Sequence, residues 1–122
     1  MSKTILIVDD SASLRQVVSI SLKGAGYSVI EACDGKDAMT KLNGQKIHLI
    51  ISDVNMPNMD GITFVLEAKK LAAYKFTPII MLTTEAGETK KLAGQAAGAK
   101  AWVTKPFQPA QMLAAVSKLI LP

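Results

Sequence analysis

The chain has 122 residues, enough for a single domain that buries about two-thirds of the surface it would expose when unfolded. It holds one cysteine, and its apolar runs are shorter than the ~18 residues of a membrane span. The first of these runs is too short and wrongly flanked to predict a signal peptide, so we expect a cytoplasmic protein without disulfides or cysteine-ligated zinc. The formal net charge is +4, but the lysines are scattered and not interleaved with aromatic residues, which favours a solvated surface over a nucleic-acid interface.

The first part of the chain alternates between strand-like and helix-like segments. Residues 4–8 form an apolar, β-rich run, and residues 14–22 then carry apolar side chains at helical spacing before a Gly-Ala-Gly stop at 24–26. A second strand is predicted over 27–32, and Asp34 is expected to cap a short helix that ends at Asn43 and Gly44. We expect Cys33 to be a small buried or half-buried apolar residue.

The rest of the chain repeats this alternation. Strands are predicted over 47–52, 78–83 and 101–104, and helices over 61–73, 85–97 and 108–121. Strands that are apolar on both faces and separated by helices indicate a parallel sheet covered on both sides, with right-handed crossovers. We therefore predict a doubly wound α/β sandwich of five βα units, in which residues 1–122 form one domain without an output domain.

Polar side chains stand at the predicted carboxyl ends of four strands. Asp9 and Asp10 follow the first strand, Asp53 the third, and Lys105 the fifth, while Thr83 ends the fourth. In open α/β sheets ligands bind beyond these ends, so we expect the side chains to converge at one edge. Each residue alone is also typical of a turn, a cap or a loop, and their joint placement is what indicates a site.

Three carboxylates at one edge repel each other unless a cation joins them. Mg²⁺ suits this edge best, because it takes one or two carboxylates, keeps several waters and leaves positions for phosphate oxygens. Asp9 and Asp10 are predicted to hold the metal, and the backbone carbonyl of Asn55 could complete its coordination. The sequence therefore predicts a magnesium site that accepts a phosphoryl group.

Asp53 is the predicted phosphoacceptor, because it stands alone at the end of the central strand. A carboxylate can attack phosphorus to form an acyl phosphate, while metal and cationic groups stabilise the phosphoryl oxygens. Lys105 could pair with a carboxylate or an incoming anion, and the Thr83 hydroxyl could donate to one further oxygen.

These features, Asp9 and Asp10, the segment DVNMPNMDG at 53–61, Thr83 and the segment KPF at 105–107, resemble the receiver domains of response regulators. The resemblance is closest to the regulators of chemotaxis and covers essentially the whole chain. It implies a flavodoxin-like sheet with strand order 2-1-3-4-5. It also implies a phosphoprotein of a two-component system, phosphorylated on Asp53 by a sensor histidine kinase.

The resemblance implies roles for the metal-site residues and for others near them. Mg²⁺ would be bound by Asp10, Asp53 and the Asn55 carbonyl, with Asp9 acting through water. Thr84 would slow access to the phosphorylation pocket, and Glu85 and Asn55 would influence self-dephosphorylation.

The resemblance further implies an aromatic switch. Lys105 would contact the phosphoryl group and Thr83 would move toward it, which frees a pocket for an aromatic residue three positions before the lysine. That residue is Trp102, where the family usually has Tyr or Phe, and its larger indole would strain the inward rotamer.

The predicted function is a phosphorylation-driven switch, a phosphoacceptor that promotes its own phosphorylation and dephosphorylation but is not a turnover enzyme. We expect a monomer whose partners are the kinase, an output protein such as the flagellar motor switch, and a phosphatase. We expect it to bind neither nucleic acid nor a membrane. Candidate contacts on the output face are Trp102, Lys100, Lys90, Lys91 and Gln111.

Parts of the sequence are also compatible with other roles. A phosphorelay or phosphate-sink receiver, which only exchanges phosphoryl groups with a kinase, stays open beside the diffusible messenger. A haloacid-dehalogenase-like phosphatase is disfavoured, because Asn55 replaces its general acid. A flavodoxin is disfavoured because Asp9 and Asp10 would repel the phosphate of a bound flavin.

Overall fold

The computed structural model describes residues 3–54, 56–83, 98–104 and 108–120, and its centre is a parallel sheet. The strands are β1 (Thr4–Val8), β2 (Ser28–Ala32), β3 (Leu49–Asp53), β4 (Ile79–Thr83) and β5 (Ala101–Thr104). They run in the order β2-β1-β3-β4-β5, and every neighbouring pair is parallel. The predicted fold class and strand order are confirmed.

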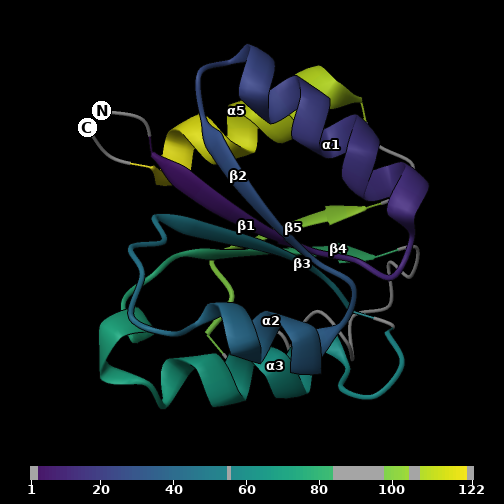
Figure 1. Ribbon diagram of the computed structural model, residues 1–122. Coiled ribbons are helices and arrows are strands. Elements are labelled where there is room, and N and C mark those ends of the chain that lie inside the picture. The colour runs from purple at the N-terminus through teal and green to yellow at the C-terminus, as the bar shows by residue number, and fades with distance from the viewer. Residues whose placement is uncertain (1–2, 55, 84–97, 105–107, 121–122) are drawn as a thin grey trace.

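Helices cover both faces of the sheet (Figure 1). α1 (Ala12–Gly24) and α5 (Pro109–Leu119) lie on one face, and α2 (Gly35–Lys41) and α3 (Gly61–Lys69) lie on the other. The predicted helix over 85–97 lies outside the described residues. None of the helices within the described ranges is long and apolar enough to cross a membrane.

The strands are apolar on both faces because alternate side chains enter two separate cores. In β1, Ile5 and Ile7 pack with residues of α1 and α5, whereas Leu6 and Val8 pack with residues of α2 and α3. All four are at most 1% exposed, and burying one such side chain contributes roughly 1.5–3 kcal/mol. The central strands are therefore fixed from both sides, which holds their carboxyl ends in place.

Short polar side chains begin three of the helices. Ser11, Asp34 and Asp60 each accept a hydrogen bond from the backbone N–H three residues ahead, at 3.3, 2.8 and 2.8 Å. Each such N-cap satisfies one N–H that the first helical turn leaves without a partner. The cap predicted at Asp34 is thus present, and the turns after β1, β2 and β3 all end in a defined helix start.

Besides shifts of one or two residues at the ends of other elements, such as α5, which was predicted over 108–121, two larger details differ from the sequence-based expectations. Cys33 is exposed, because it follows β2 at the outer edge of the sheet, where its N–H donates to Asp37 Oδ2 at 3.0 Å. The helix predicted over 61–73 ends at Lys69, because Leu71 has extended backbone angles and a 3-10 turn, η1 (Ala72–Tyr74), follows it.

Candidate functional site

Three carboxylates meet at the carboxyl-end edge of the sheet. Asp9 and Asp10 directly follow β1, and Asp53 is the last residue of β3. One oxygen of each carboxylate lies within 4.8 Å of the other two. Asp9 is 1% exposed and Asp53 is 6% exposed, whereas Asp10 is open to solvent. The structure therefore brings together the three acidic residues that the strand ends predicted.

Backbone groups orient the two buried carboxylates. The N–H of Ser11 donates to Asp9 Oδ1 at 2.9 Å, and the N–H of Val54 donates to Asp53 Oδ1 at 2.8 Å. The Ser52 hydroxyl also donates to the Asp53 carbonyl oxygen at 2.9 Å. Charge-assisted bonds of this kind hold a carboxylate in one orientation, so two of the three acidic groups are already placed before any ligand arrives.

This donor set fits a hard divalent cation. Mg²⁺–oxygen bonds of 2.0–2.1 Å place two ligand oxygens of one ion about 3–4 Å apart, and these carboxylate oxygens lie within 4.8 Å of one another. Carboxylate oxygens are also the ligands that Mg²⁺ prefers, and two nearly buried carboxylates gain more from a cation than exposed ones do. The acidic cluster could therefore hold a magnesium ion.

Arg15 is a supporting residue that the sequence analysis missed. From α1 its Nη1 donates to the Asp9 carbonyl oxygen at 2.5 Å, and its Nε donates to Glu31 Oε1 on β2 at 3.3 Å. The side chain is only 17% exposed. Arg15 thereby ties the turn that carries Asp9 and Asp10 to both α1 and β2. Its place one helical turn after the Ser11 N-cap, shortly beyond the paired aspartates, was the available sequence signal.

Asn58 is a second residue that was missed. Its φ of 68° lies in the left-handed region, and its Nδ2 donates to Asp34 Oδ2 at 2.7 Å. The N–H of Asp37 and the Asn58 amide together hold the pKa of Asp34 below its ordinary value. This bond connects the loop after Asp53 to the start of α2, and Pro57 followed by Asn58 is the turn sequence that could have indicated it.

The remaining predicted site residues fall into two groups. Thr83 ends β4 and stands opposite Thr104 of β5 in the register. Trp102 of β5 is partly buried and packs against the core on the α2 and α3 side. Lys100 and Gln111 are exposed. The residues that lie outside the described ranges are Asn55, Thr84, Glu85, Lys90, Lys91 and Lys105.

His48 lies at the opposite end of the sheet, directly before β3. Its Nδ1 accepts the backbone N–H of Thr4 at 2.9 Å. Burial and the nearby charges of Lys3 and Lys46 lower its pKa. His48 is therefore remote from the acidic edge.

Comparisons with known proteins agree with this geometry. The family model of the response regulator receiver domain matches residues 5–117. A solved structure of the chemotaxis protein CheY4 from Vibrio cholerae superposes with a TM-score of 0.94 and 46% identity, covering 98% of this chain and 99% of that one.

Two curated relatives add to this picture. The alkaline phosphatase synthesis transcriptional regulatory protein PhoP of Bacillus subtilis is 39% identical over 98% of this chain, but this chain covers only 49% of PhoP. The protein PilG of Pseudomonas aeruginosa is 35% identical over 92% of this chain and 83% of its own length. The chain thus spans about half the length of the first relative.

Proposed function

Because the chain belongs to the response regulator receiver domain family, we propose that it accepts a phosphoryl group on Asp53 and thereby changes its binding to another protein. The acidic cluster carries this proposal, since Asp9, Asp10 and Asp53 place carboxylate oxygens within 4.8 Å of one another. Burying two carboxylates costs free energy unless hydrogen bonds or a cation compensate, so their burial at this edge supports a metal-dependent phosphoryl site.

In the proposed step, an Asp53 carboxylate oxygen attacks the phosphorus of the donor. A new O–P bond forms, the bond from phosphorus to the donor's leaving atom breaks, and its electron pair leaves with the donor. The N–H of Val54 holds one Asp53 oxygen and thereby sets the direction of the other. The product is an acyl phosphate on Asp53, and the chain acts as a phosphoacceptor and not as a turnover enzyme.

Mg²⁺ is the proposed cofactor. Asp10, Asp53 and the Asn55 carbonyl would bind it, with Asp9 acting through water. When bound, it would neutralise the carboxylates and the charge that develops on the phosphoryl oxygens. Lys105 is proposed to contact the phosphoryl group, and Thr84 and Glu85 to modulate its loss.

We propose that phosphorylation causes a conformational change that is transmitted from Thr83 to Trp102. The added phosphoryl group brings about two negative charges and strong acceptors to the edge of the sheet, enough to reorder a neighbouring loop. Trp102 lies on β5 next to the strand that Thr83 ends. A change at Thr83 could therefore reach the β5 and α5 face, where an output protein would bind.

A role in chemotaxis or flagellar motor control, in the cytoplasm and with a sensor histidine kinase as donor, is the more specific proposal. It rests on the match to CheY4, a chemotaxis protein, over nearly the full length of both chains. The alternative is a relay or phosphate-sink receiver. Binding of a flagellar motor switch peptide that tightens on phosphorylation would favour the messenger, and unchanged binding would favour the sink.

The first test of the proposed function is the intact mass of the protein after incubation with a small acyl phosphate, with and without Mg²⁺. We expect one phosphoryl adduct that requires Mg²⁺ and is removed by hydroxylamine, as an acyl phosphate is. An adduct that forms equally well without Mg²⁺, or that resists hydroxylamine, would contradict the proposal.

A further inference from the structure

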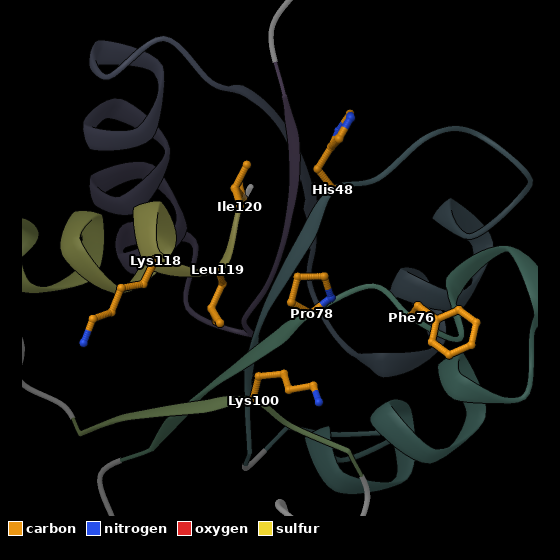
Figure 2. A pocket seen from close by; sticks show the side chains of 7 residues that line it. All are labelled: His48, Phe76, Pro78, Lys100, Lys118, Leu119 and Ile120. Atoms are coloured by element: carbon orange, nitrogen blue, oxygen red, sulfur yellow. The ribbon is translucent and has the colours of Figure 1, made fainter. Parts of the chain in front are cut away.

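The loop between α2 and β3 carries the one Asn-Gly pair of the chain, at Asn43 and Gly44. Both residues are exposed. The loop leads to the amino end of the sheet, where Figure 2 shows His48 before β3 and Pro78 before the neighbouring β4. Asp53 ends β3, so the length of this strand separates the loop from the acidic cluster.

An Asn-Gly pair is chemically labile, because the backbone nitrogen of the glycine can attack the side-chain amide carbon of the asparagine. That nitrogen first gives up its proton to a solvent base, and glycine offers no Cβ that would block its approach. A new C–N bond forms, and the amide nitrogen leaves with the electron pair of its broken bond and takes up a proton to become ammonia. Water then opens the resulting cyclic imide at one of its carbonyls, which gives aspartate or isoaspartate.

The Asn43 side chain is folded over the group that would attack it. Its Oδ1 accepts the N–H of Gln45 at 3.3 Å, an arrangement in which an asparagine side chain turns back onto the backbone two residues ahead. The side chain thus spans Gly44, whose nitrogen is the attacking atom. Gly44 has a φ of 97°, in the left-handed region, so glycine is the residue that this loop accepts most readily here.

A buried tyrosine holds the attacking nitrogen. The N–H of Gly44 donates to the Tyr74 hydroxyl at 3.0 Å, and that hydroxyl donates to the Gln45 carbonyl oxygen at 2.7 Å. Tyr74 belongs to η1 and is 2% exposed, so the core fixes the position of its ring. The Gly44 nitrogen can therefore lose its proton and turn toward the amide carbon only when this bond opens.

The two tyrosine bonds couple the loop to a distant part of the chain. Tyr74 is 30 positions from Gly44 and 29 from Gln45. By contrast, the Gln45 side chain donates to the Lys41 carbonyl at 2.9 Å, only four positions away. Contacts as local as this one can persist when the loop swings away from the core, whereas the bonds to Tyr74 cannot. Tyr74 thus controls how often the loop opens.

We propose that Asn43 is a site of spontaneous deamidation and that the Tyr74 hydroxyl restrains this reaction in the folded protein. The aspartate product adds a negative charge to the loop. The isoaspartate product adds a methylene group to the backbone before Gly44, which moves its N–H away from Tyr74. The modified chain should then unfold at lower urea concentration, because a buried hydroxyl loses a partner. The reaction needs only water and occurs far from Asp53, so it is independent of the proposed function.

The test follows the conversion of amide to carboxylate at position 43 by peptide mass spectrometry, after incubation of the full chain in mildly alkaline buffer. A synthetic peptide of residues 40–48 gives the unrestrained rate. We expect the folded chain to react at least about ten-fold more slowly than the peptide. The mass gain distinguishes deamidation from isomerisation of the Asp-Gly pairs at 34–35 and 60–61, which leaves the mass unchanged.

Tyr74→Phe removes the hydroxyl but keeps the ring, and it should speed the conversion at least about five-fold. The matched control is Tyr27→Phe, which changes the other tyrosine of the chain, packed against the core on the α1 and α5 side. Its rate should stay within about two-fold of wild type. Equal rates in Tyr74→Phe and wild type, or in the folded chain and the peptide, would overturn the proposal.

A further variant separates local opening of the loop from unfolding of the whole domain. Ile80→Val lowers stability from within the core on the α1 and α5 side and leaves the loop unchanged. Its conversion rate should stay within about two-fold of wild type. An acceleration as large as that of Tyr74→Phe would show that global unfolding controls the reaction and would overturn the proposal. The peptide and Ile80→Val leave Tyr74 unchanged, so these measurements decide the matter even if Tyr74→Phe does not fold.

Discussion

A side chain at Gly61 would collide with the backbone of Asp53. A Cβ atom built on Gly61 lies 2.0 Å from the Asp53 carbonyl oxygen and 2.9 Å from its carbonyl carbon. Real Cβ atoms do not approach other atoms this closely, so only glycine allows α3 to begin against the end of β3. The N–H of Gly61 also donates to the Val54 carbonyl at 2.8 Å. The start of α3 thereby fixes the residue we propose as phosphoacceptor.

We expect Gly61→Ala to lower the free energy of unfolding by about 1–3 kcal/mol, because the added methyl must displace the end of β3. Phosphorylation by a small acyl phosphate should slow as well, since Asp53 moves. The control is Gly24→Ala at the end of α1, where a Cβ meets nothing within 4 Å and alanine favours the helix by about 0.5–1 kcal/mol. Urea denaturation checks both variants, and equal stabilities would contradict the close approach.

Asn58→Gly should raise the pKa of Asp34 toward its ordinary value. The variant removes the amide donor at 2.7 Å but tolerates the positive φ. Because the folded pKa of Asp34 is lowered, this carboxylate stabilises the fold above its unfolded pKa, and that stability is lost as the pH falls through the folded pKa. The loss of stability between neutral pH and about pH 3 should therefore be smaller in the variant.

A carboxyl titration of Asp34 by NMR measures this shift directly. Asn58→Ala is the comparison, because it removes the same donor but places a Cβ in the left-handed region, which costs about a further 1 kcal/mol at every pH. An Asp34 pKa that is the same in wild type and Asn58→Gly would show that the amide does not hold the carboxylate.

Asp10→Ala should weaken Mg²⁺ binding by at least about ten-fold and remove most phosphorylation, because it takes away one of three clustered carboxylates. Without Mg²⁺ the same variant should melt about 2–4 °C higher, since it relieves repulsion between like charges. Calorimetric Mg²⁺ titration tests the first effect. Glu67→Gln, which removes a charge on α3, is the control and should keep wild-type affinity. Wild-type affinity in Asp10→Ala would refute the metal assignment.

The strands were the part of the fold that the sequence determined best. β1 and β5 have the predicted bounds, because each is a short apolar run with polar neighbours. β3 begins at Leu49 instead of Ile47, although the N–H of His48 still donates to the Thr4 carbonyl at 2.8 Å. Periodicity places a segment in a sheet, but the first and last paired residues depend on the neighbouring strand.

The acidic cluster was predictable because parallel strands present their carboxyl ends at one edge. The contacts that support this cluster were not predictable from the sequence. Arg15 reaches Asp9 from another element, and Asn58 reaches Asp34 across 24 positions of sequence. The requirement for glycine at position 61 was not predictable either, because it comes from the close approach of two elements. Such contacts depend on tertiary packing, which local sequence patterns do not encode.

Thr83→Ala should keep the phosphoryl adduct but reduce the accompanying change in Trp102 fluorescence to less than about half of the wild-type change, because Thr83 is proposed to transmit the charge of the phosphoryl group. Trp102 is the chain's one tryptophan and is partly buried against the core, so its emission reports this strand alone. A full fluorescence change in Thr83→Ala would exclude this route.

The central claim, that Asp53 is the phosphoacceptor, is tested most directly by locating the modification. After treatment with a small acyl phosphate and Mg²⁺, borohydride reduction converts an acyl-phosphorylated aspartate to homoserine, which peptide mass spectrometry can place. We predict homoserine at position 53 and none in the Asp53→Asn variant. Homoserine at position 9 or 10, or an unmodified position 53 in a protein that carries the phosphoryl adduct, would contradict the account.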